Sequence, residues 1–154
     1  MTDAPNLIDW DLPEPFIMPI QVQSEDVDRL GHANNVVYVR WLEDISWAHI
    51  ESLGMTWEKH EATGKAMAIT RTEIDYLAAA NSGEHLLLGT WLVDFDGRFR
   101  SGRRFQLVRP DDSKTLVRAH STHACIDLKT QRPSRVPKEY AELLGGAVHN
   151  TPAT

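Results

Sequence analysis

The longest regular pattern in the chain is a stripe of apolar residues at helical spacing between Asn35 and Leu53. Its members recur every three or four positions, at Val37, Tyr38, Trp41, Leu42, Ile45, Ala48, His49 and Leu53. Further apolar residues fall outside this stripe, at Val36, Val39, Trp47 and Ile50. More than half of the helix circumference is therefore apolar. Because Gly54 supplies the usual C-terminal stop, the pattern predicts one long helix over residues 35–53 that is covered on most sides.

Apolar runs bounded by turn residues fill most of the remaining chain. They span residues 66–76, 85–93, 98–109 and 115–128. An earlier run, in which Ile20 and Val22 alternate with glutamines, predicts a strand that leads to Asp28. Strands that follow one another through short turns form an antiparallel sheet. The sequence therefore predicts an α+β fold, with an antiparallel sheet wrapped around one long central helix.

The two ends of the chain differ in pattern from the part between them. Residues 1–16 contain three prolines among acidic residues, which favours an extended N-terminal arm. Residues 138–144 predict a short closing helix, and residues 145–154 predict a frayed tail. Since 154 residues are enough for one core of ordinary size, we predict a single domain over residues 17–144.

Composition and charge argue against several classes of protein. The formal net charge of −6 does not suit a nucleic-acid binder, because such proteins usually carry a basic face. The single cysteine, Cys125, permits no intramolecular disulfide, which fits a reducing compartment. The N-terminus lacks the basic and apolar regions of a signal peptide, and no apolar run is long enough to span a bilayer. We expect a soluble cytoplasmic protein without a membrane partner.

The segment 26–38 combines an acid, a tight turn, an imidazole and a helix start. Asp28 supplies a carboxylate, Gly31 permits a sharp turn, and Asn34 or Asn35 can cap the helix that follows. The first backbone N–H groups of that helix have no intrahelical partner, so they suit an oxygen that becomes negative during a reaction. This combination indicates acyl transfer to water.

The same residues also have structural interpretations. An aspartate close to a glycine commonly serves as a turn or cap residue. Asp26 points the same way as Asp28 on an extended chain, or it has a structural role. His32 either polarises a carbonyl or orients water, or it is a polar residue at a helix entry. The spacing alone leaves these alternatives open.

The order of residues in this segment resembles the signature of the hotdog-fold acyl-CoA thioesterases of the hydroxybenzoyl-CoA thioesterase type. The matching positions are Asp26, Asp28, Gly31, His32, Asn34, Asn35, Tyr38, Trp41 and Glu43. A second family block is matched at Ile74, Asp75, Tyr76, Ala80, Gly83 and Glu84. Ala79 stands where that block usually has proline, and Glu84 replaces its aspartate. Both departures lie in or beside a turn, so they concern turn geometry more than chemistry.

The resemblance implies roles for individual residues. Asp28 corresponds to the nucleophile or general base of the family, and the backbone N–H of Asn35 corresponds to its oxyanion donor. His32 is assigned to the same catalytic group. Aromatic residues expected along the acyl group are Tyr38, Trp41, Trp47 and Trp57.

One basic concentration interrupts the acidic chain, over residues 98–104. Its charges either protect an edge strand from aggregation or bind the nucleotide phosphates of CoA, for which arginine is well suited. The resemblance implies phosphate contacts from this strand and from the tail, by Arg98, Arg100, Ser101 and Arg132.

No motif in the chain indicates a metal ion or another cofactor. His120 and His123 are three positions apart, so on a regular strand they face opposite sides. The patterns of a zinc protease, a phosphate-binding loop and a serine-nucleophile elbow are incomplete or absent.

The predicted function is hydrolysis of an acyl-CoA thioester to a free acid and CoA, without a cofactor. Two alternatives are a thioesterase that acts on acyl carrier protein and a non-catalytic hotdog module that binds acyl-CoA. The presence of Asp28 argues against the second. Because one sheet around one helix leaves strand edges and apolar helix surface uncovered, we also predict self-association as a dimer or tetramer.

Overall fold

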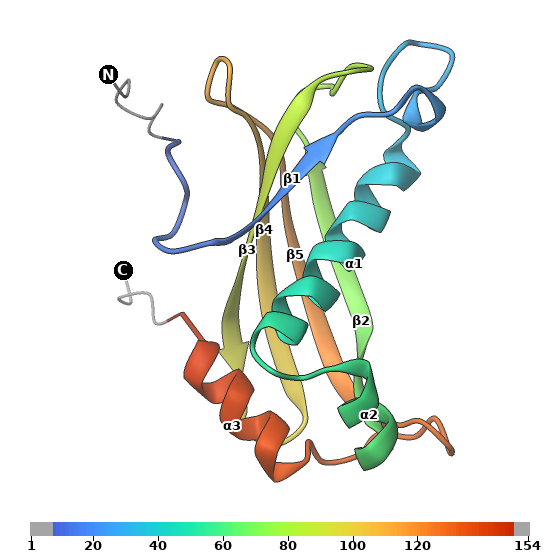
Figure 1. Ribbon diagram of the computed structural model, residues 1–154, viewed down its shortest axis with the longest axis vertical. Coiled ribbons are helices and arrows are strands. Elements are labelled where there is room, and N and C mark those ends of the chain that lie inside the picture. The colour runs from blue at the N-terminus through green and yellow to red at the C-terminus, as the bar shows by residue number, and fades with distance from the viewer. Residues whose placement is uncertain (1–7, 150–154) are drawn as a thin grey trace. The chain divides into compact units, whose positions relative to one another are not determined.

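The structure is a computed structural model that describes residues 8–149. The elements, in chain order, are β1 (Phe16–Gln21), the 3₁₀ turn η1 (Ser24–Asp26), α1 (Asn35–Ser52), α2 (Trp57–Thr63), β2 (Lys65–Tyr76), β3 (His85–Phe95), β4 (Arg100–Arg109), β5 (Lys114–Asp127) and α3 (Lys138–Ala147). The strands form one antiparallel sheet in the order β1-β3-β4-β5-β2, with β1 and β2 at its edges (Figure 1). The α+β prediction is confirmed.

The order of the strands decides where the chain must cross the sheet. β3, β4 and β5 are neighbours both in sequence and in the sheet, so short turns join them. β2 and β3 follow one another in sequence but are not neighbours, so the segment 77–84 has to pass the end of the strands between them. On this path the backbone N–H groups of Leu77 and Ala78 donate to the carbonyl of Leu116 at 2.8 and 3.2 Å.

The described chain divides into two compact units, and each has its own core. The first unit consists of residues 8–46, 74–90 and 105–119. The second consists of residues 47–73, 91–104 and 120–149. Helix α1 and four of the strands contribute residues to both units.

In the first unit, the N-terminal part of α1 packs on the sheet through the predicted apolar stripe. The buried side chains of this part are Val37, Tyr38, Trp41, Leu42 and Ile45. They belong to one cluster with side chains of β1, β3, β4 and β5, among them Ile20, Leu88, Phe105 and Val117. Complete burial of one such aliphatic side chain contributes about 1.5–3 kcal/mol. The stripe therefore fixes which face of α1 meets the sheet.

In the second unit, α3 and the end of α1 share a smaller core. Its buried members are Ile50, Met55, Leu92, Cys125, Val136, Tyr140 and Leu144. The closing helix runs to Ala147, beyond the predicted end at residue 144. Val148 forms a bridge with Leu92, and the backbone N–H of His149 donates to the carbonyl of Leu92 at 2.7 Å. Residues 145–147 therefore belong to α3, and Val148 and His149 contact β3. Residues 150–154 lie outside the described residues.

Two short elements were not predicted from the sequence. η1 follows β1 directly, so β1 ends at Gln21 and does not lead to Asp28 as expected. α2 begins after Thr56, whose side chain accepts a hydrogen bond from the backbone N–H of Lys59, and ends at Gly64 with a φ of 69°. A left-handed residue at this position is the usual helix terminator.

The described part of the predicted N-terminal arm, residues 8–15, is fastened to the sheet within the first unit. The Asp11 carboxylate forms two contacts with the Arg118 guanidinium, at 2.7 and 3.0 Å. The side chain of Gln106 accepts from the backbone N–H of Asp11 at 2.8 Å and donates to the carbonyl of Asp9 at 3.3 Å. Because Gln106 lies between Phe105 and Leu107 on β4, the arm lies on the sheet face away from α1. Residues 1–7 lie outside the described residues.

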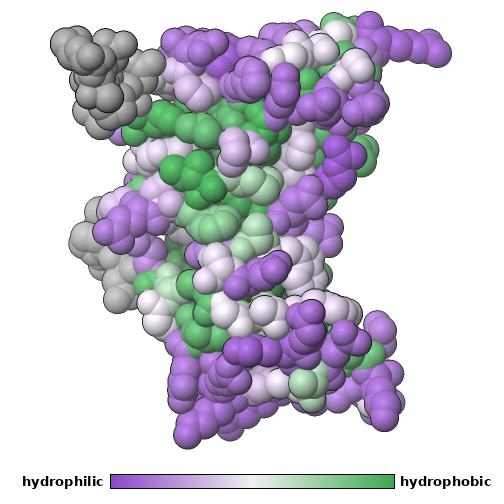
Figure 2. Space-filling model, viewed as in Figure 1, coloured by the Kyte–Doolittle hydropathy of each residue, from purple (hydrophilic) through white to green (hydrophobic). Residues whose placement is uncertain are grey.

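The edge strand β1 carries apolar residues that reach the surface. Figure 2 shows hydrophobic residues in the region where Figure 1 draws β1, and Ile17 of this strand is 42% exposed.

Within residues 8–149, no helix combines the length and the apolar character needed to cross a bilayer.

Candidate active site

Asp28 lies in a tight loop between η1 and α1. Its carboxylate accepts a hydrogen bond from the backbone N–H of Leu30 at 2.8 Å, and its carbonyl accepts from Gly31 at 3.0 Å. Gly31 has a φ of 81°, which side chains disfavour and glycine tolerates. The backbone N–H of Asp28 donates to the carbonyl of His32 at 2.9 Å and closes the loop. The carboxylate of Asp28 remains at the surface, because Asp28 is an exposed residue.

Helix α1 begins at Asn35, three residues after His32. The side chain of Asn34 accepts from the backbone N–H of Val36 at 3.1 Å, so Asn34 is the N-cap and Asn35 is the first helical residue. Within residues 8–149, the backbone N–H of Asn35 has no hydrogen-bond acceptor. This donor therefore carries the positive end of the helix dipole and is available to a substrate oxygen.

The loop, the start of α1 and the end of β2 line one pocket with a volume of about 350 Å³. The polar part of its lining consists of Asp28, His32, Asn34 and Asn35. Another part consists of Tyr76, the last residue of β2, and of Leu77, Ala78 and Ala79, which follow it. Leu30, Ala33 and Tyr38 complete the lining. The predicted catalytic residues Asp28, His32 and Asn35 thus lie around a single pocket.

Hydrogen bonds join the two parts of the pocket lining. The backbone N–H of Ala33 donates to the carbonyl of Ala80 at 2.8 Å, and the backbone N–H of Ala80 donates to the Tyr38 hydroxyl at 3.1 Å. The Tyr76 hydroxyl donates to the carbonyl of Asn35 at 3.3 Å. Burial raises the pKa of Tyr38, so its hydroxyl stays protonated at neutral pH.

Asp26 does not point the same way as Asp28, because the chain between β1 and α1 is not extended. Its side chain is 4% exposed and forms an ion pair with Arg40 at 2.9 Å. It also accepts from the backbone N–H of Gln23 at 2.9 Å, which closes the η1 turn. The structural interpretation of Asp26 therefore applies.

The aromatic residues expected along the acyl group have different positions. Tyr38 lines the pocket, whereas Trp41 is buried in the core and contacts the Tyr38 ring edge-on, with centroids 5.3 Å apart. Trp47 and Trp57 belong to the second unit, where their rings meet at 6.2 Å. Of the four, only Tyr38 is brought to the pocket.

The predicted phosphate-binding residues all belong to the second unit. Arg98, Arg100 and Arg132 are exposed, whereas Ser101 is only 5% exposed. The segment between β5 and α3, which contains Arg132, runs beside the turn before β4, since the backbone N–H of Val136 donates to the carbonyl of Arg98 at 2.8 Å. The basic residues before and in β4 and the segment that contains Arg132 are therefore neighbours within this unit.

Tyr76, at the end of β2, and the residues that follow it were not expected to line the site. Tyr76 was noted only as part of a family block, and Ala79 only for its effect on a turn. The sequence signal for their role was the block itself, which begins 46 residues after Asp28 and contains none of the predicted catalytic residues.

The pocket supplies a carboxylate, an imidazole, an unpaired backbone donor and an apolar surface. A carboxylate can attack an acyl carbon or accept a proton from water, and a helix N-terminus can stabilise the oxyanion that forms. No group of three His, Cys, Asp or Glu residues in the described chain is arranged to hold a metal ion.

Comparisons with known proteins identify the family of this chain. The family model described as the thioesterase-like superfamily matches residues 22–144. The long-chain acyl-CoA thioesterase FadM of Escherichia coli (strain K12) is 27% identical over 126 residues, which cover 81% of this chain and 93% of FadM.

Two solved structures share the fold. Slr0204 from Synechocystis, a 1,4-dihydroxy-2-naphthoyl-CoA thioesterase, has a TM-score of 0.77 at 19% identity, and the match covers 89% of this chain and 100% of that one. SAV2348 from Staphylococcus aureus, solved in complex with CoA, has a TM-score of 0.82 at 17% identity, with 93% and 89% covered. The chain therefore belongs to the thioesterase-like superfamily, with a hotdog fold and the activity of a thioester hydrolase.

Proposed function

We propose that the protein hydrolyses an acyl-CoA thioester, with Asp28 as nucleophile or general base and the backbone N–H of Asn35 as oxyanion donor. The observation that carries this proposal is that the exposed carboxylate of Asp28 and the first residue of α1 line the same pocket. FadM, the relative with 27% identity, acts on long-chain acyl-CoA, and this supports CoA as the thiol part of the substrate.

In either mechanism the thioester oxygen accepts a hydrogen bond from the Asn35 N–H. The positive end of the α1 dipole then stabilises the charge that develops on this oxygen. If Asp28 is the nucleophile, its oxygen bonds to the acyl carbon, the C–S bond breaks, the CoA sulfur takes up a proton, and water hydrolyses the anhydride. If Asp28 is the base, it removes a proton from the attacking water and returns it to the leaving sulfur.

The remaining residues of the pocket orient the substrate. His32 either polarises the thioester carbonyl or orients the water molecule. Leu77 and Ala78 provide apolar surface for the acyl group next to the Tyr76 ring.

We also propose that Arg98, Arg100 and Arg132 bind the phosphates of CoA. Their guanidinium groups are exposed, and arginine forms paired hydrogen bonds with phosphate oxygens. Ser101 is buried, so we assign the phosphate contacts to the three arginines.

A panel of thioesters tests the function directly. Pure protein is incubated with short-chain, long-chain and aromatic acyl-CoA thioesters, and a thiol reagent measures the CoA released. The same acyl groups are offered on pantetheine, which lacks the nucleotide, and on acyl carrier protein. We expect release from at least one acyl-CoA and a higher KM for its pantetheine analogue, because the phosphate contacts are missing.

The rival functions give different results in this panel. Preference for acyl carrier protein over CoA would identify a carrier-protein thioesterase instead. Binding of acyl-CoA without thiol release would identify a non-catalytic module, and equal KM values for CoA and pantetheine thioesters would contradict the role of the arginines.

A further inference from the structure

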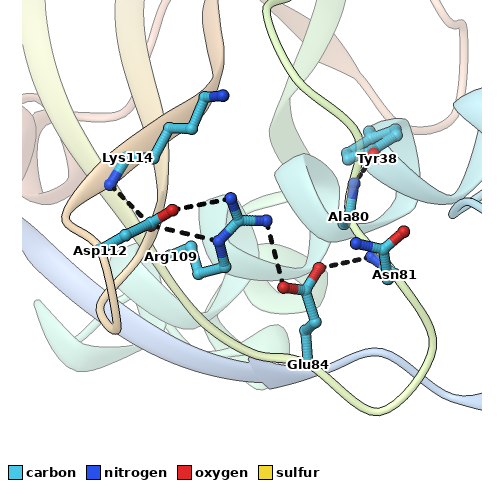
Figure 3. A network of polar contacts seen from close by, with 7 residues as sticks. All are labelled: Tyr38, Ala80, Asn81, Glu84, Arg109, Asp112 and Lys114. Carbon is cyan, nitrogen blue, oxygen red and sulfur yellow. Dashed lines mark hydrogen bonds and ion pairs between the residues drawn. The ribbon is translucent and has the colours of Figure 1, made fainter.

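An ion-pair network lies at the C-terminal end of the segment 77–84 (Figure 3). Its centre is Arg109, the last residue of β4. Two nitrogens of the Arg109 guanidinium contact the two carboxylate oxygens of Asp112, at 3.1 and 2.8 Å. A third nitrogen contacts the carboxylate of Glu84 at 3.1 Å. Asp112 also accepts from the backbone N–H of Lys114 at 3.1 Å, so the arginine is fixed from the β4–β5 turn.

The Glu84 carboxylate connects this arginine to the backbone of the pocket segment. One of its oxygens accepts from Arg109 and the other from the backbone N–H of Asn81. The backbone N–H of Glu84 also donates to the carbonyl of Asn81 at 3.1 Å. Figure 3 shows the carboxylate between the guanidinium and Asn81. Glu84 therefore closes a turn and ties it to β4 at the same time.

The turn held in this way carries the contacts that fix the catalytic loop. Asn81 forms an antiparallel bridge with His32. The adjacent residue, Ala80, accepts from the backbone N–H of Ala33 and donates to the Tyr38 hydroxyl. Each of these partners lines the pocket. His32 is thus connected to Arg109 through three successive contacts, by way of Asn81 and Glu84.

We propose that Arg109, acting through Glu84, is a positioning residue for the thioester hydrolase reaction. The inference rests on the proposed function of the pocket. In this role, the ion pair of Arg109 and Glu84 keeps the loop that contains Asp28 and His32 in its position. The two side chains are only 19% and 22% exposed, so solvent screens their attraction less than that of a surface pair. A displacement of a reacting group by about 1 Å can lower the rate about a hundredfold.

The chain offers a matched control. Arg118 also forms two contacts with a carboxylate, that of Asp11, in the same unit. These contacts fasten the N-terminal arm and do not involve the segment 77–84. Arg118→Gln therefore removes an arginine–carboxylate pair of the same chemistry without touching the pocket.

The experiment compares Arg109→Gln, Glu84→Gln, the double variant and Arg118→Gln with the wild-type protein. We expect kcat to fall about tenfold to a hundredfold in each variant of the pair, with KM little changed. Glutamine at position 84 can still accept from Asn81, so this variant removes only the link to Arg109. Because both single substitutions remove the same contact between Arg109 and Glu84, the double variant should lose no more than the stronger single variant. Arg118→Gln should keep the wild-type kcat.

Backbone amide exchange at Ala33 and Ala80 gives a readout that does not depend on activity. Both amides should exchange faster in Arg109→Gln than in the wild type and in Arg118→Gln. Wild-type kcat in the pair variants, or an equal loss in Arg118→Gln, would overturn the positioning role while the proposed function stands. If the wild-type protein hydrolyses no thioester, the proposed function fails, and unchanged exchange at Ala33 in Arg109→Gln would then overturn the positioning role separately.

Discussion

Asp26 and Asp28 are separated by one residue and have opposite environments. Asp26 is buried, forms an ion pair with Arg40 and accepts a hydrogen bond from the backbone N–H of Gln23, whereas Asp28 is exposed in the pocket. Asp26→Asn should therefore lower the free energy of unfolding by about 1–3 kcal/mol, because buried hydrogen bonds to a charged group weaken. Denaturant unfolding measures this loss. The folded variant should keep kcat near the wild-type value, and a loss of kcat without a loss of stability would contradict this assignment.

A second residue-scale prediction concerns two histidines of the second unit, His123, which is buried, and His49, which is partly buried. Burial, and then the nearby Arg103 guanidinium, lowers the pKa of His49 to about 4, and Arg103 lies 2.8 Å from its ring nitrogen. Burial, Arg103 and His120 lower the pKa of His123 to about 4 as well. In the unfolded chain both titrate near about 6.5. The unfolded state therefore binds more protons between these values, and stability falls as the pH drops from about 6.5 toward 4.

Thermal unfolding measured between pH 8 and pH 4 checks this dependence. His123→Asn and His49→Asn should each flatten the decline, since asparagine does not titrate. A melting temperature that stays constant from pH 7 to pH 4 in the wild type would contradict the buried neutral state of these imidazoles.

At the scale of elements, a substitution at the start of α1 tests whether the backbone N–H of Asn35 is the oxyanion donor. Proline at the first helical position suits a helix, because its φ is already helical and this N–H has no intrahelical partner. Asn35→Pro therefore keeps α1 but removes the proposed donor, whereas Asn35→Ala keeps the donor. We expect kcat to fall about 10²–10³-fold in Asn35→Pro and to stay near wild type in Asn35→Ala. Equal kcat in the two variants, with unchanged melting temperatures, would assign the oxyanion to another donor.

The helix α1 also explains how much of the fold could be predicted. Its apolar stripe repeats over five turns, so the sequence defined its range to within one residue, 35–53 against Asn35–Ser52. The turn η1 was missed because it depends on the Asp26 side chain reaching back to Gln23, a contact that leaves no periodic signal. α2 was missed because seven residues are too few for a clear helical stripe.

The pocket was predictable only in part, for a similar reason. Asp28, His32 and Asn35 are close in sequence and match one family signature. Their position in one loop and helix start could therefore be predicted from the sequence. Tyr76 and Leu77 reach the pocket because the chain crosses from β2 to β3 past the end of the sheet. That crossing depends on strand order, which the pattern of apolar runs does not contain.

At the scale of the whole molecule, we expect a dimer as the smallest stable form. Leu30 lines the pocket and is 77% exposed, and Val36, on the first turn of α1, is 73% exposed. Apolar surface beside a site is a frequent position for a subunit interface. Light scattering at micromolar concentration should give at least twice the mass of one chain, and Val36→Asp should weaken the association. A monomer in the wild-type measurement would contradict this expectation.

The most direct test of Asp28 as the reacting acid is the kcat of Asp28→Asn with the acyl-CoA that the wild-type protein hydrolyses best. Asparagine has nearly the same shape but is neither a base nor a carboxylate nucleophile, so the fold and the Kd for acyl-CoA should change little. We predict a loss in kcat of at least about 10²–10⁴-fold, the usual contribution of a positioned acid or base. Wild-type kcat in Asp28→Asn would contradict the mechanism, and failure of this variant to fold would return Asp28 to a structural role.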